Sequence, residues 1–134
     1  MDAFDADVLI YAAVPEHPLG RRVRALLEDP DTVRIGSTLL LPEILAKPTR
    51  DHTAAELRSL IAVLSRIELR ACDEATGSLA VGLAATYGLR AADAVHLATA
   101  VAAGADRFIT NNSRDFPDHV VELAVTYPQD LSDV

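Results

Sequence analysis

Hydrophobic and polar positions along the chain form two alternating kinds of segment. Short apolar runs are typical of buried strands, and segments with an apolar residue every three or four positions are typical of helices packed on a sheet. The short runs predict strands near residues 3–14, where the strand runs into a helix or loop, and near 32–37, 67–71, 106–112 and 120–126. The periodic segments predict helices near residues 20–28, 39–47, 56–66, 73–87 and 90–103.

Glycine and proline mark where these elements begin and end. Pro42 is expected in the first turn of its helix, where a missing N–H costs little, and Gly88 and Gly104 are expected to end the two helices before them. The segment KPTRD at 47–51 is expected to break the chain between two helices. The tail after residue 126 has no clear pattern.

Alternation of strands with helices predicts an α/β fold. We expect a single three-layer domain over residues 1–134, with a mostly parallel central sheet and helices on both faces. Sheets of this kind bind ligands at the carboxyl ends of their strands. The residues that follow the predicted strands are therefore the first candidates for a functional site.

Composition narrows the function. No apolar run approaches the roughly 20 residues that cross a bilayer, and the first residues are acidic, unlike those of a signal peptide. Cys72 has no second cysteine with which to form an internal disulfide. We therefore expect a cytoplasmic protein that does not associate with a membrane. The formal net charge of −8 disfavours a protein that coats DNA without sequence preference, although it leaves room for a local basic groove. No Ser-His-Asp set, P-loop or GxGxxG motif is present.

Acids and amides cluster after the predicted strands. Asp5 and Asp7 interrupt the first strand and are expected to project to one face, and Asp93 opens an almost entirely apolar helix, where we expect it to be buried. Each acid also has a structural interpretation, because carboxylates stabilise the first turn of a helix and cap turns. The other polar residues of this group are Glu43 in the helix at 39–47 and Asn111, Asn112 and Asp115 after the strand near 106–112.

Converging carboxylates favour a hard cation. They repel one another unless some are protonated or a cation lies among them, and an oxygen-only cluster suits Mg²⁺ or Mn²⁺. Such a metal lowers the pKa of bound water and neutralises a phosphate under attack. His96, one turn after Asp93, could be a base or ligand, but is interpreted first as a packed core residue; His17, His52 and His119 fall in loops without ligand spacing.

Four segments, FDADVLIYA, LLLPEIL, LRAADAVHLATA and DRFITNNSRDF, together resemble PIN-domain ribonucleases, especially the VapC-type toxins of toxin-antitoxin pairs. The resemblance implies that Asp5, Glu43 and Asp93 bind Mg²⁺ or Mn²⁺. It also implies that water is activated there for in-line attack on an RNA phosphodiester, leaving a 5′-phosphate. Thr110 matches a hydroxyl residue at the end of the fourth strand and is expected, with Asn112, to contact the substrate.

Two departures from the family pattern concern the same site. The family often has an acid where Asn112 stands, so either this amide holds water and phosphate or Asp115 supplies the fourth catalytic acid. Asp7 stands where an uncharged polar residue is more usual, and the negative charge that it adds is expected to tighten or crowd the site.

The resemblance also implies partners: an RNA substrate, a cognate antitoxin that covers the active groove, and a second copy in a homodimer. RNA would then meet local basic residues, although those near residue 22 could equally form a solvated helix face. The candidates are Arg21, Arg22, Arg24, Lys47, Arg50 and Arg114.

Two other interpretations stay open. The stretch DADVL at 5–9 also resembles the first motif of haloacid-dehalogenase-like phosphatases, with Asp5 as nucleophile, Asp7 as acid and Thr110 in the second motif. That family needs a lysine after this threonine, whereas the only lysine, Lys47, precedes Thr110. The chain could instead be a catalytically silent interaction module. Retention of Asp5, Glu43 and Asp93 argues against that, because a silent domain has no need of a repelling acid cluster.

Overall fold

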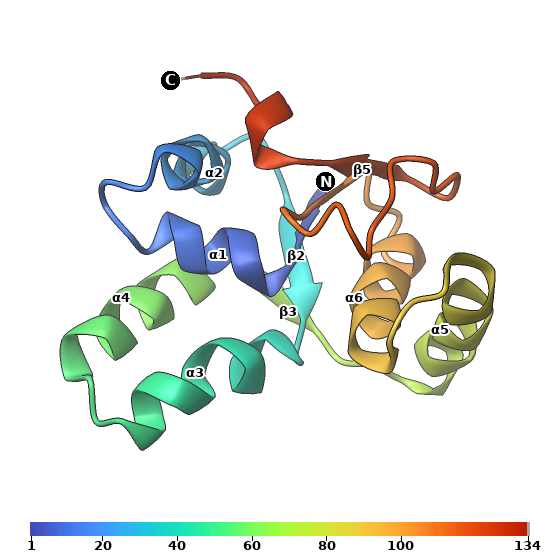
Figure 1. Cartoon of the computed structure of the whole chain (residues 1–134), viewed down its shortest axis with the longest axis horizontal. Coiled ribbons are helices and arrows are strands. Elements are labelled where there is room, and N and C mark those ends of the chain that lie inside the picture. Colours follow the sequence, from blue (N-terminus) through green and yellow to red (C-terminus); the bar gives the residue numbers. More distant parts are fainter. Residues whose placement is uncertain (134) are drawn as a thin grey trace.

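The computed structural model describes residues 1–133 and has a parallel sheet at its centre (Figure 1). The strand order is β3-β2-β1-β4-β5, and every neighbouring pair is parallel. This arrangement confirms the predicted α/β class. The strands are β1 (Asp2–Phe4), β2 (Arg34–Ser37), β3 (Glu68–Arg70), β4 (Arg107–Ile109) and β5 (Ala124–Thr126).

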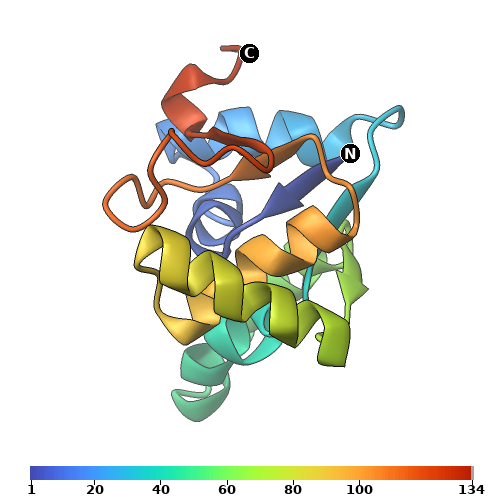
Figure 2. The ribbon, with the colours of Figure 1, turned by 90° about the vertical axis from the view of Figure 1, so that its right-hand side faces the viewer.

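Helices cover both faces of the sheet. Figure 1 shows α1 to α4 on one side and α5 and α6 on the other, and in Figure 2 the α5–α6 pair lies in front of the strands. No helix within residues 1–133 is long and apolar enough to cross a membrane. The helices are α1 (Ala6–Ala12), α2 (Pro18–Glu28), α3 (Leu40–Arg50), α4 (Ala54–Leu64), α5 (Glu74–Tyr87) and α6 (Ala91–Ala102), followed by a 3₁₀ turn, η1 (Pro128–Asp130).

Each face of the sheet has its own apolar core. Phe108 packs under α6 with Leu97 and lies 4.9 Å, centroid to centroid, from Phe116. Its neighbour Ile109 points to the other face and packs with Phe4 and the residues of α1 to α4. Because successive side chains of a strand point to opposite faces of the sheet, even these short strands contribute side chains to both cores.

An ion pair joins the two central strands at their amino ends. The guanidinium of Arg107 on β4 donates two hydrogen bonds of 2.9 Å to the carboxylate of Asp2 on β1. The Asp2 side chain is only 4% exposed, whereas that of Arg107 is 36% exposed. A two-pronged, charge-assisted contact of this kind fixes the register of β1 against β4.

The prediction that Asp5 and Asp7 alternate along the first strand was wrong. The strand ends at Phe4, Asp5 is the N-cap residue of α1, and Asp7 lies in the first turn of that helix. Aspartate favours this position because its carboxylate oxygen accepts a bond from a free N–H group at the helix start. The expected turn cap therefore exists, and Asp5 provides it.

The predicted break at 47–51 was also wrong. Helix α3 continues through a buried Pro48 to Arg50, and the reversal comes at His52, which has a positive φ of 55°. A proline in the last turn removes only one bond of the helical ladder, and its ring is buried against the core. By contrast, Pro42 lies in the first turn of α3 as predicted.

The last predicted strand is shorter than expected. Only Ala124–Thr126 pairs with β4, although Val120 and Leu123 are buried in the core beneath α5 and α6. The apolar pattern there reports burial of loop side chains and not a ladder of backbone bonds. Gly88 and Gly104 do follow the ends of α5 and α6, with φ values of 66° and 76°, as predicted.

Candidate active site

The central strand β1 ends beside the starts of three helices. The chain leaves β1 into α1, and its neighbours β2 and β4 lead toward α3 and toward a polar loop. Since β1 lies between strands that follow it on both sides, its carboxyl end is the switch point at which such sheets bind ligands. Every acid that the sequence placed at this edge lies in one of these segments or in the first turn of α6.

Asp5 is the most enclosed of these acids, with 6% of its surface exposed. One carboxylate oxygen accepts a bond of 2.8 Å from the Ala6 N–H, and the other accepts a bond of 2.8 Å from the Thr110 hydroxyl. Burial nevertheless raises the pKa of Asp5, against the charge of His96 and these hydrogen bonds. Thr110 therefore contacts a candidate catalytic acid directly, from the end of β4.

A short polar chain leads on from Thr110. Its Oγ1 accepts from the Asn112 N–H at 3.1 Å, and the Asn112 side chain donates to Asp115 Oδ2 at 2.8 Å. The Asp115 N–H returns a bond of 3.2 Å to Asn112 Oδ1. Asn112 and Asp115 thus hold each other side by side, so both lie where the fourth position of the site is expected.

Asp93 lies in the first turn of α6, as predicted, but it is half-buried and not fully buried. Its burial raises its pKa, and the negative charges of Asp5 and Asp115 raise it further. These interactions place three acids, from α1, α6 and the loop after β4, within electrostatic reach of one another. The backbone N–H groups at the start of α6 favour a carboxylate at this position.

Glu43 reaches the same edge from the first turn of α3. Its Oε1 lies 2.5 Å from Nε2 of His96, which belongs to α6 on the other face of the sheet. The His96 side chain is only 1% exposed, which confirms the interpretation of His96 as a packed core residue with a bonded ring nitrogen. Its partner, however, is a candidate catalytic acid, and the spacing from Asp93 alone did not predict that contact.

Asp7 borders the cluster. Its two oxygens accept from the N–H groups of Val8, at 2.7 Å, and Asn111, at 3.1 Å. Burial, and then the charge of Asp5, raises the pKa of Asp7 from 3.8 to about 7. The extra acid therefore crowds the site electrostatically while tying the loop after β4 to α1.

The chemistry of this donor set fits a hard divalent cation. All the donors are carboxylates. Burial raises the pKa of Asp5 and Asp93, and neighbouring negative charges raise it further, a cost that a cation would relieve. Within residues 1–133, however, no three Asp, Glu, His or Cys side chains lie close enough together to hold a metal ion as they stand. Binding would thus require the acids to draw together around the ion.

Arg22 and Arg24, both proposed to meet RNA, donate to backbone carbonyl groups. Arg22 donates to those of residues 129 and 131, and Arg24 donates to three at the end of α1 and in the segment that follows it. Arg50 is exposed and pairs with the neighbouring Asp51 at 3.2 Å. Lys47 and Arg114 are also exposed; Lys47 lies one helical turn after Glu43, and Arg114 directly precedes Asp115.

His17 and His119 have structural contacts, and the ring of His119 lies 6.0 Å, centroid to centroid, from that of Tyr87. His17 caps α2 through Nδ1, which accepts from the N–H groups of Leu19 and Gly20, and its ring stacks on Tyr11 at 4.3 Å. The Tyr11 hydroxyl accepts from the side chain of Asn111, next to the acid cluster. Sequence reasoning missed this pair; the available signal was a histidine directly before a proline that opens a helix.

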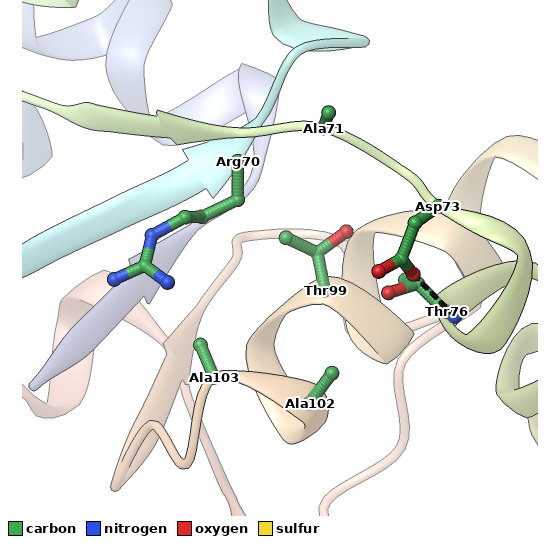
Figure 3. A pocket seen from close by; sticks show the side chains of 7 residues that line it. All are labelled: Arg70, Ala71, Asp73, Thr76, Thr99, Ala102 and Ala103. Atoms are coloured by element: carbon green, nitrogen blue, oxygen red, sulfur yellow. Dashed lines mark hydrogen bonds between the residues drawn. The ribbon is translucent and has the colours of Figure 1, made fainter.

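A cavity of about 290 Å³ lies away from the acids (Figure 3). It is lined from the end of β3, the start of α5 and the last turns of α6, the opposite end of that helix from Asp93. Its polar groups are already occupied, because Asp73 caps the Thr76 N–H and Arg70 pairs with Glu68. The lining residues are Arg70, Ala71, Asp73, Thr76, Thr99, Ala102 and Ala103.

Residues 3–120 match the model of the PIN domain family. A toxin-antitoxin complex from Klebsiella pneumoniae contains a chain with 24% sequence identity and a TM-score of 0.75, the match covering 96% of this chain and 98% of that one. VapBC2 from Rickettsia felis, bound to a DNA fragment from its promoter, matches with 17% identity and a TM-score of 0.76, over 94% and 97% of the two chains. Among curated proteins, none matches in sequence. The two structures establish similarity of fold.

Proposed function

This chain belongs to the PIN domain family, and on that premise we propose that it is the toxin of a toxin-antitoxin pair, a metal-dependent endoribonuclease. The observation that carries the proposal is the meeting of Asp5, Glu43, Asp93 and Asp115 at the carboxyl edge of the sheet, from four segments of the matched region. Capping explains each acid separately. It does not explain why four acids share one edge, where the charges of neighbouring acids add to the burial that raises the pKa of Asp5 and Asp93.

Asp5, Glu43 and Asp93 would hold Mg²⁺ or Mn²⁺, with Asp115 as the fourth acid. When bound, the cation supplies a more acidic water and neutralises charge on the phosphate under attack. Thr110 holds the carboxylate of Asp5 and the backbone of Asn112 in place. Lys47 and Arg114, both exposed beside the acids, are the candidate contacts for the RNA backbone.

The proposed partners follow from the same family and from the complexes to which the fold is similar. One of those structures is described as a toxin-antitoxin complex, which supports an antitoxin partner for this chain. A homodimer and a cytoplasmic location belong to the same proposal. Family membership removes the phosphatase alternative, whereas a silent PIN interaction module is the alternative that an activity measurement must exclude.

The test is cleavage of a labelled pool of cellular RNA with Mn²⁺, with Mg²⁺ and with chelator. The wild type is compared with Asp93→Asn and with Asp118→Asn, which removes an exposed carboxylate that is not one of the four acids. We expect cleavage that requires metal, is lost in Asp93→Asn and is retained in Asp118→Asn. Cleavage that persists in chelator, or equal cleavage by both variants, would contradict the proposal. A folded wild type with neither cleavage nor metal binding would support the silent module.

A further inference from the structure

His96 is a buried polar side chain in a helix whose other buried positions are mostly apolar. Its side chain is 1% exposed, and Nε2 lies 2.5 Å from Glu43 Oε1. Glu43 belongs to α3, which covers one face of the sheet, and His96 belongs to α6, which covers the other (Figure 1). The contact therefore joins the two helical layers across the edge that carries the acids.

The two partners differ in how much freedom they have. The Glu43 side chain is 37% exposed, so that without a fixed partner its three rotatable bonds would sample several rotamers in solvent. The His96 ring is enclosed by the core and has one orientation available to it. The hydrogen bond to the fixed His96 ring therefore restricts the rotamers of the partly exposed Glu43 carboxylate.

The second ring nitrogen of His96 lowers the stability of the folded protein. Nδ1 of His96 is buried and has no hydrogen-bond partner among residues 1–133. A buried polar atom without a partner is unfavourable, and an apolar side chain of similar size would fill the same space without that penalty. Packing alone therefore does not account for a histidine at this position, whereas the bond to Glu43 does.

We infer that His96 is a positioning residue that holds the Glu43 carboxylate at the acid cluster before a divalent cation arrives. The inference rests on the proposed function, because it gives Glu43 a cation to bind. His96 itself neither ligates the cation nor contacts the RNA, since its Nε2 is engaged by Glu43. The bond occupies one oxygen of Glu43 and leaves the second for another ligand.

The test measures Mn²⁺ binding by the loss of the free-ion electron paramagnetic resonance signal, with no RNA present. His96→Gln places an amide N–H near the position of Nε2, whereas His96→Asn is too short to reach Glu43. We expect His96→Gln to bind Mn²⁺ almost as the wild type does and His96→Asn to bind it 10- to 100-fold more weakly, the effect expected for losing a group that orients a metal ligand. Thr99→Val, which alters a buried residue of α6 bonded only within its own helix, is the control and should bind normally.

A second pair of variants separates positioning from a general loss of structure. In a Glu43→Ala background, His96→Asn should weaken Mn²⁺ binding no further, because its effect passes through Glu43. Equal binding by wild type and His96→Asn, or additive losses in the double variant, would overturn the inference alone. A folded wild type that binds no Mn²⁺ would overturn the metal-dependent function and the inference together. If thermal unfolding shows that His96→Asn does not fold, His96→Leu replaces it.

Discussion

Replacing Asp7 by asparagine should stabilise the protein at neutral and alkaline pH. Asparagine has the shape of a protonated aspartate but only one acceptor oxygen, so it keeps only one of the two backbone N–H bonds that Asp7 accepts. Where Asp7 is protonated in both the folded and unfolded states, Asp7→Asn should therefore be less stable by about 1 kcal/mol. That holds below the ordinary value of 3.8. In the folded wild type the pKa is raised to about 7, so stability is lost as the pH rises through this window. Asp7→Asn cannot ionise and keeps that stability.

The size of the effect follows from the two pKa values. A shift from 3.8 to about 7 is about 3 pH units, and each unit corresponds to about 1.4 kcal/mol, so Asp7→Asn should gain about 4 kcal/mol of stability relative to the wild type between low pH and pH above 7. For a domain of this size that corresponds to a rise in Tm of roughly 10 to 15 °C. A bound cation would favour the ionised form, and so the measurement needs a chelator.

The assay is thermal unfolding of both proteins in chelator at pH 4, 5.5, 7 and 8.5. The Tm of Asp7→Asn relative to the wild type should rise across this series, from slightly negative to clearly positive, while the titration of other groups largely cancels. Asp118→Asn, at an exposed position, should show no such trend. A difference that is independent of pH, or a less stable Asp7→Asn at pH 8.5, would refute the reasoning.

Three further predictions concern the scaffold of the site. Thr110→Val removes a donor to Asp5 and an acceptor for the Asn112 N–H, and should lower the free energy of unfolding in urea by about 2 to 3 kcal/mol. The control Thr99→Val should lower it by less than about 1 kcal/mol. Similar losses in the two variants would contradict this prediction. Arg107→Ala leaves the enclosed Asp2 without its cation and should lower the free energy of unfolding by about 3 kcal/mol. Asp2→Ala should lower it less, because the partly exposed Arg107 can then be hydrated. The reverse order of stabilities would be inconsistent with the ion pair described. Gly20→Ala should lower Tm because its Cβ would overlap the Tyr11 carbonyl, whereas Gly82→Ala, with open space around it, should stabilise α5 by about 1 kcal/mol; a neutral Gly20→Ala would show that α2 can move away from α1.

The fold followed from the sequence where local pattern and tertiary packing agree. Alternation of apolar runs and periodic segments predicted the parallel sheet, and Gly88 and Gly104 marked two helix ends correctly. The pattern failed where one residue type has two uses. Asp5 interrupts a strand-like run because it caps the next helix, and Pro48 stays inside a helix because only its last turn loses a bond.

The acids of the site could be predicted as a group, because strand ends in a parallel sheet meet at one edge. Their partners could not. The contact between His96 and Glu43 joins residues 53 positions apart on opposite faces, and no periodicity reports it. Likewise, no sequence pattern indicated that Asn112 and Asp115, the two candidates for the fourth position, exchange hydrogen bonds with each other.

The central position of β1 in the sheet also determines the order in which the parts of the protein can fold. The strand made first lies between β2 and β4, and its pairing with β4 joins residues about 105 positions apart, as does the bond from Thr110 to Asp5. Contacts that are so distant in sequence form late, because the entropy of closing the long loop must be overcome first. During synthesis, the acid edge therefore cannot assemble until β4 and the loop after it have left the ribosome, so a chain truncated before β4 lacks both the central strand pair and the completed site.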